Sequence, residues 1–482
     1  MRLLFVNPTL AEDFSALDIA ITVLASVVNA GGRHRAAICD LTFHRRHWQR
    51  TLDLAIARHR PALIAMSTNT MYMKFVRLVA DYAARVHGLP VLVGGHHATR
   101  FPEETMALGC FAHLLTGDAE ETLPGLLDRL EANLPAEDLP GYYRRLDGNT
   151  LRPAAPGRFY QDLHRLPHLD WDLWEELPRY FYYLGMLYMI GSRGCPYRCT
   201  FCDAVGLDNA AEGSYFRLAP PEQYAKELAW QWEKYRGKGL RLAQLFDPVF
   251  TLNKPWVLAF AKAYIATGAH REFGYSVFSR IDNLDQERIE ALAESGCKLL
   301  RVGIEAGNER VRKNTYAKNI SNHEVRRIIT LARKHGLGFT TFFILGGPSE
   351  DRRTMLETIR LAREVNPRRS AFFIYKPFTS EGLKQLREHG CSVHEDRWAA
   401  ADNISFGAVF DSPNFSRAEV QALQHLAYSV TFGQRLLGML REHPVLYFAR
   451  LFAYVGRGLA DGLSPAYLAM YFHVYGYDYI DH

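Results

Sequence analysis

The alternation of short apolar runs with amphipathic runs is the feature of this sequence that most restricts its fold. In the first region, to about residue 135, apolar runs indicate strands at 2–7, 35–39, 62–67, 90–93 and 112–115, and helical periodicity falls at 17–29, 48–58, 71–86 and 120–130. Because these strands are continuously apolar and separated by helices, we expect a doubly wound, Rossmann-like parallel sheet with helices on both faces.

The loops that follow these strands are rich in small residues. Such a sheet binds ligands at the carboxyl ends of its strands, and there the sequence places Ser67, Gly94, Gly95 and Gly117. Small residues allow backbone amides to approach a ligand closely. These four residues are therefore the candidate ligand-binding residues of the first region (1–135). The two histidines after Gly95 are expected to be ordinary loop residues, one packed and one exposed.

After a proline-rich linker at 136–180, the alternation resumes. Apolar runs indicate strands at 188–191, 240–246, 273–277, 298–304, 339–345 and 370–375, with helices at 222–235, 254–266, 285–295, 321–335 and 354–365. This repetition predicts a (β/α)6 partial TIM barrel over 181–399, with its active site at the carboxyl ends of the strands. Residues 400–482 predict a helical C-terminal lid, with helices at 417–437, 440–455 and 466–473.

Three of the seven cysteines lie in one short stretch, GSRGCPYRCTFCDA, at residues 191–204. Thiolates are the usual protein ligands of iron–sulfur clusters, normally four to a cluster. Cys195, Cys199 and Cys202, spaced C-x3-C-x2-C, can hold three irons of a 4Fe–4S cluster and leave the fourth iron open to a substrate or cofactor. A zinc site would need a second pair of cysteines or histidines at suitable spacing, and the sequence has no such C-x2-C partner. Chance burial of cysteines does not account for this spacing.

The cysteine stretch resembles the signature C-x3-C-x-aromatic-C of the radical S-adenosylmethionine (SAM) superfamily, with Phe201 in the aromatic position. The resemblance implies that the amino and carboxylate groups of SAM bind the open iron. It also implies reductive cleavage of SAM to a 5′-deoxyadenosyl radical, which is chemistry of the cofactor. By the same resemblance, Phe201 and residues 344–347, which include Gly346, would flank the adenine.

The first region resembles the cobalamin-binding domain that precedes the cluster domain in one large class of this superfamily. The similar pieces are NPTL, LASVVNAGG, LVGGHHATRFPEE and TGDAEETL. The motif D-x-H-x-x-G, whose histidine binds cobalt in another type of cobalamin domain, is absent. This absence fits a class whose members often bind cobalamin without a protein histidine, and it also leaves open a domain that has lost the cofactor. The expected cofactors are a 4Fe–4S cluster, SAM and, as an open question, cobalamin.

Polar residues follow several strands of the predicted barrel, namely Asp247, Arg280, Glu305 and Lys376. A carboxylate can accept hydrogen bonds from both hydroxyls of a ribose, and a guanidinium can pair with a carboxylate through two hydrogen bonds. By resemblance, Glu305 would bind the ribose of SAM and Arg280 its methionyl carboxylate. Asp247 stands where the family often has two aspartates. An ion pair that closes the barrel is an equal alternative for Asp247 and Lys376.

Tyr215 and Lys376 are the candidate catalytic residues. A phenol near a radical can donate a proton or a hydrogen atom, and an ammonium can donate a proton. Because the chain has 25 tyrosines, packing is the favoured interpretation of Tyr215.

The resemblance favours an enzyme that takes a hydrogen atom from a small-molecule biosynthetic intermediate and methylates its carbon with cobalamin. A second hypothesis is a cobalamin-independent dehydratase, cyclase or rearrangement enzyme, for example one acting on an aminoglycoside sugar diol. A third, a cluster-bearing redox or scaffold protein, is disfavoured by the strand-end residues Arg280 and Glu305. An enzyme of this kind needs an external electron donor, such as flavodoxin, ferredoxin or a reductase.

Composition restricts the partners. A net charge of +5 on 482 residues, without a dense basic tract, gives no indication of nucleic-acid binding. No apolar run reaches the roughly 18–20 residues of a membrane-spanning helix, and the first residues show no export signal. With seven cysteines, three of them clustered, the sequence predicts a cytoplasmic protein in a reducing compartment.

Overall fold

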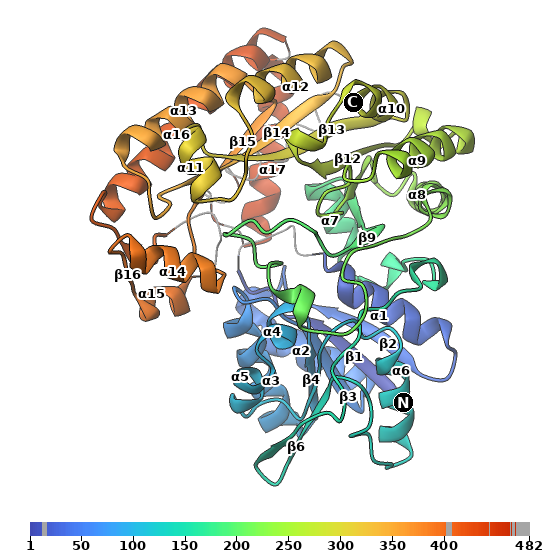
Figure 1. The fold of residues 1–482 in the computed structure, drawn as a ribbon. Coiled ribbons are helices and arrows are strands. Elements are labelled where there is room, and N and C mark those ends of the chain that lie inside the picture. The colour runs from blue at the N-terminus through green and yellow to red at the C-terminus, as the bar shows by residue number, and fades with distance from the viewer. Residues whose placement is uncertain (12–16, 402–406, 443, 463, 465–467, 469–482) are drawn as a thin grey trace. The chain divides into compact units, whose positions relative to one another are not determined.

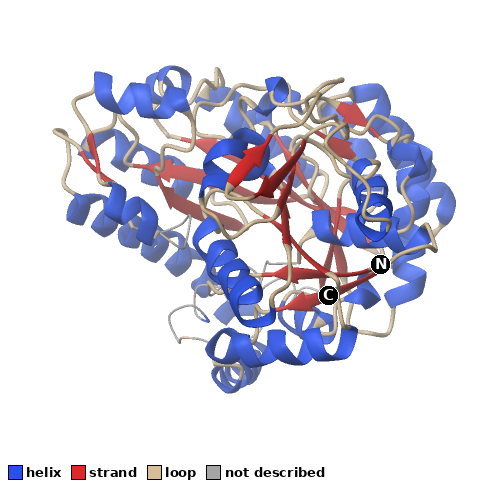
Figure 2. Ribbon diagram, turned by 90° about the horizontal axis from the view of Figure 1, so that it is seen from below, coloured by secondary structure: helices blue, strands red, loops and turns tan. Residues whose placement is uncertain are grey.

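A computed structural model describes residues 1–11, 17–401, 407–442, 444–462, 464 and 468 (Figure 1). The chain forms two compact units. The first contains Met1–Tyr180 and Gly206–Ala219, and the second contains Phe181–Val205 and the described residues from Pro220 onward. The boundary between them falls within helix α7 (Leu177–Tyr183). In each unit the strands, red in Figure 2, are flanked by helices.

The first unit is built on a seven-stranded sheet in the order β2-β1-β3-β4-β5-β6-β7. Its strands are β1 (Arg2–Asn7), β2 (Arg35–Asp40), β3 (Leu63–Ser67), β4 (Val91–Gly94), β5 (His113–Leu115), β6 (Tyr142–Leu146) and β7 (Asn149–Leu151). Its helices are α1 (Ile19–Ala30), α2 (Trp48–His59), α3 (Met73–His87), α4 (His96–Arg100), α5 (Pro102–Ala107) and α6 (Thr122–Glu131). Strands β1 to β5 are parallel, which confirms the doubly wound sheet, and β6 and β7 extend it as an antiparallel hairpin.

The parallel strands are apolar on both faces because helices cover both faces. The buried positions of α3 are Val76, Val79, Ala80 and Ala83, spaced as one face of a helix requires. They belong to the same apolar core as alternate residues of β1, β3 and β4. The hydrophobic periodicity therefore sets both the helix and the face that it buries.

The strand order also marks where a ligand would bind to the first unit. The chain runs from β1 to β2 on one side and then returns to β3 on the other side of β1. In doubly wound sheets the ligand crevice lies at such a switch point, outside the carboxyl ends of the two strands. Asn7 ends β1 and Ser67 ends β3. The Asn7 amide donates to Asp40 Oδ1 (3.0 Å), and the Thr9 hydroxyl donates to Asn7 Oδ1 (3.0 Å), so the loop after β1 is internally bonded.

The proline-rich region 136–180 belongs to the first unit rather than standing apart as a linker. It supplies the β6–β7 hairpin, which was not predicted because its strands, YYRRL and NTL, are mostly polar and half-exposed. Trp171 and Trp174 are buried. The indole N–H of Trp174 donates to Thr22 Oγ1 on α1 at 2.9 Å. These contacts attach the region to helix α1.

Residues 206–219, which follow the cysteine stretch, also belong to the first unit, although the sequence placed them in the barrel. Gly117, Arg158 and Glu212 form a short parallel ladder. Arg217 begins the short strand β10 (Arg217–Leu218). Its buried guanidinium donates to Asp118 Oδ2 at 2.7 Å. The segment is thus fixed to the loop after β5. The contacts of this segment, and not its position in the sequence, place it in the first unit.

The second unit is built on a six-stranded parallel sheet in the order β15-β14-β13-β12-β11-β8. Its strands are β8 (Met186–Met189), β11 (Leu242–Leu245), β12 (Gly274–Ser279), β13 (Cys297–Glu305), β14 (Gly338–Leu345) and β15 (Arg369–Ile374), and the short β9 (Ser192–Arg193) follows β8. The intervening helices are α8 (Pro221–Tyr235), α9 (Lys254–Thr267), α10 (Gln286–Glu294), α11 (Glu309–Asn314), α12 (Asn322–Lys334) and α13 (Arg352–Val365). The spatial order of the strands follows the chain order, which confirms the (β/α)6 partial barrel.

The C-terminal region covers an edge of this sheet. Its elements are α14 (Ser380–Glu388), β16 (Ser392–Val393), α15 (Glu395–Ala400), β17 (Phe410–Asp411), α16 (Arg417–Glu442) and α17 (Pro444–Ala460). On α16, the Gln424 amide donates to the Phe372 carbonyl of β15 (2.7 Å), and the Tyr428 hydroxyl accepts from the Phe372 N–H (3.1 Å). These bonds occupy main-chain groups at the edge strand. The expected helix at 466–473 lies, apart from Leu468, outside the described residues.

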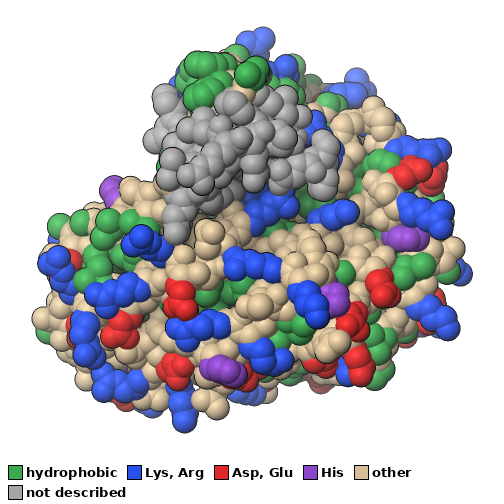
Figure 3. Space-filling model, turned by 90° about the horizontal axis from the view of Figure 1, so that it is seen from above, with side chains coloured by type: hydrophobic (Ala, Val, Ile, Leu, Met, Phe, Trp, Pro, Cys, Tyr) green, Lys and Arg blue, Asp and Glu red, His purple; other side chains and the backbone are tan. Residues whose placement is uncertain are grey.

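The surface carries charges of both signs. Basic and acidic side chains are interspersed on the face drawn in Figure 3, in keeping with the small net charge of +5. Within the described ranges, no helix has the length and apolar character needed to cross a membrane.

Candidate functional site

The cysteine stretch begins at the carboxyl end of β8 and contains three free thiols. Cys199 is buried and the other two are partly exposed. Between them, the Thr200 hydroxyl donates to the Thr315 carbonyl, and the Thr379 hydroxyl donates to the Thr200 carbonyl. Thr315 lies in the connection after β13 and Thr379 in the connection after β15. The stretch is therefore held against the carboxyl ends of the barrel strands, as expected from the position of barrel active sites.

The donor set fits a 4Fe–4S cluster. Burial raises the pKa of Cys195, and the positive charges of Arg280 and Lys318 oppose that rise. Burial likewise raises the pKa of Cys202 to about 12, so the thiolates that bind iron would form when the metal binds. In the described part of the chain, no three His, Cys, Asp or Glu side chains converge as ligands of one metal ion would. A cluster makes no such demand, because each cysteine binds a different iron.

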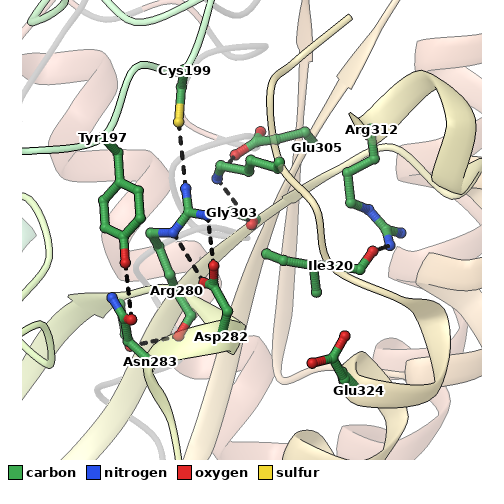
Figure 4. Close-up of polar contacts among 12 residues, drawn as sticks. Tyr197, Cys199, Arg280, Asp282, Asn283, Gly303, Glu305, Arg312, Ile320 and Glu324 are labelled. Carbon is green, nitrogen blue, oxygen red and sulfur yellow. Dashed lines mark hydrogen bonds and ion pairs between the residues drawn. The ribbon is translucent and has the colours of Figure 1, made fainter. Parts of the chain in front are cut away.

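Arg280 follows β12, and its buried guanidinium points at the cysteine stretch (Figure 4). Nη1 donates to Cys199 Sγ at 3.5 Å. Nε and Nη2 donate to the two carboxylate oxygens of Asp282 at 3.0 and 2.8 Å. The sequence suggested this guanidinium as the partner of the methionyl carboxylate of SAM. In the structure its forked edge is already occupied by Asp282.

Glu305 ends β13 and is paired with a lysine that the sequence did not indicate. Lys318 Nζ donates to Glu305 Oε1 at 2.5 Å and to the Gly303 carbonyl at 3.1 Å, and both charged side chains are buried. A Cβ on Gly303 would lie 2.1 Å from Glu305 Oε1 and 2.7 Å from Lys318 Nζ, so a side chain at this position would displace the pair. In the described part of the chain, Glu305 Oε2 makes no hydrogen bond and can accept one from a ligand.

The backbone of Glu305 is strained. Its φ of +68° lies in the left-handed region, which costs a non-glycine residue roughly 1–2 kcal/mol. The buried Arg312 holds the chain on both sides of it: Nε donates to the carbonyls of Ile304 (3.1 Å) and Ala306 (2.9 Å), and Nη1 donates to Ile320 (2.6 Å). Such strain persists where neighbouring contacts enforce it, and it is often found at functional sites.

An aromatic and acidic group lies beside this pair. The Phe201 ring meets the Tyr316 ring edge-on at 5.6 Å, and Lys318 Nζ lies 5.6 Å from the centre of the Phe201 ring. The Tyr316 hydroxyl donates to Glu350 Oε2 at 3.3 Å, and the Gly347 N–H donates to the same oxygen at 2.8 Å. Phe201, Glu305 and the glycines after β14, which the sequence assigned to one SAM site, are thus brought close together through Lys318 and Tyr316.

Glu350 is expected to make the stability of the protein depend on pH. Burial raises its pKa from an ordinary value of 4.5 to about 8. As the pH rises between these values, the unfolded chain releases the proton and the folded chain keeps it, so the free energy of unfolding falls. Glu350→Gln removes this loss. The change in the free energy of unfolding that Glu350→Gln causes should therefore be more favourable at about pH 8 than at about pH 5, by an amount on the order of a few kcal/mol.

Thermal unfolding of the wild type and Glu350→Gln at the two pH values measures this difference. Glu388→Gln, on an exposed residue of α14, is the matched control and should shift the midpoint little at either pH. If Glu350→Gln shifted the unfolding midpoint equally at both pH values, the buried carboxyl of the folded protein would be ionised already at about pH 5.

The other strand-end candidates of the barrel have structural contacts. Asp247 is buried and accepts from the Gly191 N–H (3.0 Å) and the Tyr224 hydroxyl (3.1 Å), and burial raises its pKa to about 6. These contacts are hydrogen bonds and not the expected ion pair, and the role of Asp247 stays a prediction. Gly346 lies against Val420 of α16. Lys376 is buried after β15.

The candidate residues of the first unit lie at strand ends, as expected. Ser67 and Gly94 are register partners of β3 and β4, and Gly95 follows directly. Gly117 has a φ of +76°, and a Cβ there would lie 2.6 Å from the Arg158 carbonyl oxygen. Packing of residue 158 therefore accounts for this glycine without a ligand. Of the two histidines after Gly95, the first is exposed and the second is buried, as expected.

Tyr215 belongs to the first unit, where its ring packs against Phe159 with the centroids 5.2 Å apart. This contact supports the packing interpretation rather than a catalytic one.

The residues that sequence reasoning missed are Lys318, Tyr316, Asp282 and Tyr197. Lys318 and Tyr316 lie in the connection after α11, where no periodicity or motif marks them. Asp282 was detectable in principle, since an acid two residues after an arginine at a strand end is a candidate partner for it. Tyr197 lies inside the cysteine stretch, where the spacing of the cysteines alone gives it no role.

The parallel partial barrel carries three free cysteines, a buried arginine at one of them and a buried acid–lysine pair at its strand ends; apart from the lysine, this is the arrangement that the sequence predicted for a radical SAM cluster site. The profile of the Radical SAM superfamily matches residues 189–362, and the profile of the B12 binding domain matches residues 13–127. The chain therefore carries a radical SAM domain preceded by a B12-binding domain, as the resemblance implied. Its radical SAM domain implies a 4Fe–4S cluster and SAM, and its B12-binding domain supports cobalamin as a third cofactor.

Known proteins resemble most of the chain. It is 26% identical over 396 residues to an uncharacterized methyltransferase of Pyrococcus horikoshii, covering 81% of each protein. It is 23% identical over 365 residues to the anaerobic magnesium-protoporphyrin IX monomethyl ester cyclase of Cereibacter sphaeroides, covering 73% of this chain and 56% of the cyclase. The structure of the radical SAM methyltransferase TsrM from Kitasatospora setae, with cobalamin and a [4Fe-4S] cluster bound, superposes with a TM-score of 0.66 at 17% identity, covering 80% and 74%. This likeness confirms the fold.

Proposed function

We propose that the protein transfers a methyl group to a carbon atom of a small biosynthetic intermediate. The observation that carries the proposal is the presence in one chain of a B12-binding domain and a cysteine stretch backed by Arg280 and the Glu305–Lys318 pair. The similarity to a methyltransferase over 81% of both chains supports it.

When bound, the cluster and SAM supply a 5′-deoxyadenosyl radical, and cobalamin supplies the methyl group. Cys195, Cys199 and Cys202 would hold the cluster. Oε2 of Glu305 would accept hydrogen bonds from the ribose of SAM, with Lys318 holding the carboxylate in its orientation through Oε1. Phe201 would present its ring to the adenine.

In the first unit, the loops after β1, β3 and β4 would line the corrinoid site at the switch point of the sheet. Ser67, Gly94 and Gly95 belong to these loops. An external electron donor of the flavodoxin, ferredoxin or reductase type would reduce the cluster.

The test is to load the full chain with cluster under anaerobic conditions, with and without hydroxocobalamin, and to supply methyl-labelled SAM and a metabolite extract of the source organism. Methylation predicts a product that carries the label and is heavier by one methylene, formed only with hydroxocobalamin and accompanied by 5′-deoxyadenosine. A product formed equally well without hydroxocobalamin would contradict the proposal.

A radical cyclase is the second candidate, and the similarity to the magnesium-protoporphyrin cyclase favours it. The same reaction mixture distinguishes the two. A cyclase would give an unlabelled product without the added methylene, so the mass and the label of the product decide between the functions.

A further inference from the structure

Arg280 has its donors divided between a carboxylate and a sulfur. Nε and Nη2 are bound by the two oxygens of Asp282, and Nη1 is aimed at Cys199 Sγ, 3.5 Å away (Figure 4). Arg280 is 6% exposed. A guanidinium binds a carboxylate best through its forked edge, and here that edge is already filled.

The direction of the guanidinium is fixed from a second side by the cysteine stretch itself. The ring of Tyr197 lies under the guanidinium, with Arg280 Cζ 3.8 Å from the ring centre. The Tyr197 hydroxyl donates in turn to Asn283 Oδ1 at 2.9 Å. Two residues of the turn after β12, Asp282 and Asn283, therefore hold Arg280 and the ring on which it stacks.

We propose that Arg280 is a positioning residue that sets the reduction potential of the cluster through Cys199, and is not a ligand of the methionyl carboxylate. The inference rests on the proposed function in one respect, that the three cysteines hold the cluster. Reduction adds one electron from the external donor and no proton, so the reduced cluster carries one more negative charge. A buried cation that donates to a cluster sulfur stabilises that charge and raises the potential.

Asp282 acts in the opposite sense. Its carboxylate orients Arg280 but also brings a negative charge close to the cluster, and its side chain is 30% exposed. Lys318 is a second cation whose charge acts on Cys195, and it is paired with Glu305. Because Arg280 Nη1 is in hydrogen-bond contact with Cys199 Sγ, we expect a change at Arg280 to act directly on the cluster.

The test measures the potential of the reconstituted full chain, without SAM, by redox titration followed by electron paramagnetic resonance. We expect Arg280→Gln to make the potential more negative, Arg280→Lys to give an intermediate value, and Asp282→Asn to make it less negative. Arg271→Gln, on an exposed arginine, is the matched control and should leave the potential unchanged. Iron and sulfide content verify that each variant holds a full cluster.

The alternative role gives a different pattern. If Arg280 bound the methionyl carboxylate instead, Arg280→Gln would weaken SAM binding and leave the SAM-free potential at the wild-type value, and that result would overturn the proposal. If Arg280→Gln holds no cluster, the comparison of Arg280→Lys with the wild type decides in the same way. A wild-type chain that holds no cluster would instead show that the proposed function is wrong.

Discussion

Replacing Cys199 by alanine should abolish both the iron–sulfur absorbance of the reconstituted protein and the formation of 5′-deoxyadenosine from SAM. Three thiolates are the fewest that hold a cube with one open iron, and Cys199 is the buried one, held by the hydrogen bonds of Thr200 and by Arg280. Two cysteines cannot retain the cluster against solvent and chelators. We therefore expect the turnover of SAM to fall to the background rate.

The control is Cys391→Ala, which removes a buried thiol outside the cysteine stretch. That variant should keep its iron content and its cleavage of SAM. If Cys199→Ala retained the absorbance and the activity of the wild type, the assignment of the cysteine stretch as the cluster site would be wrong.

Glu305→Gln should have the second largest effect, because it alters both stability and SAM binding. Removing one partner of a buried ion pair costs about 3–5 kcal/mol, since Lys318 would be left buried without its counter-charge. A hydrogen bond to a charged group contributes about 1.5–3 kcal/mol. The dissociation constant of SAM should therefore rise roughly 10- to 100-fold.

A double variant separates the two effects. Glu305→Gln with Lys318→Met removes both charges of this pair, so most of the lost stability should return while the affinity for SAM stays low. Glu294→Gln, on an exposed residue of α10, is the matched control and should change neither quantity. Thermal unfolding and equilibrium binding of SAM measure them. Recovery of affinity in the double variant would show that Glu305 does not bind SAM.

Most of the fold could be predicted from the sequence, because buried parallel strands and amphipathic helices carry a clear periodicity. The strand β1 (Arg2–Asn7) was placed at its observed bounds. The helix expected at 321–335 is α12, which Ser321 caps and in which Glu324 completes a capping box. The β6–β7 hairpin and the short helices α4 and α5 were missed, since short or half-exposed elements leave little hydrophobic pattern. Residues 206–219 belong to the first unit because of long-range contacts, such as that of Arg217 with Asp118, and no local sequence pattern encodes such contacts.

The site was predictable as far as its motifs reached. The cysteine spacing and the strand-end position of Glu305 indicated where the chemistry lies. The pairing of Glu305 with Lys318, 13 residues further along, depends on the path of a connection and on a left-handed backbone that only the structure shows. The direction of Arg280 could not be read from the sequence either, because a guanidinium at a strand end can face a ligand, an acid or a cluster.

Mössbauer spectroscopy of the full chain loaded with 57Fe, before and after addition of SAM, tests the central claim most directly. We expect the signal of a 4Fe–4S cluster in which one iron differs from the other three and changes when SAM is added, because no cysteine holds that iron. Four irons that do not respond to SAM, or a protein that binds zinc in place of iron, would contradict the assignment of a radical SAM site to this cysteine stretch.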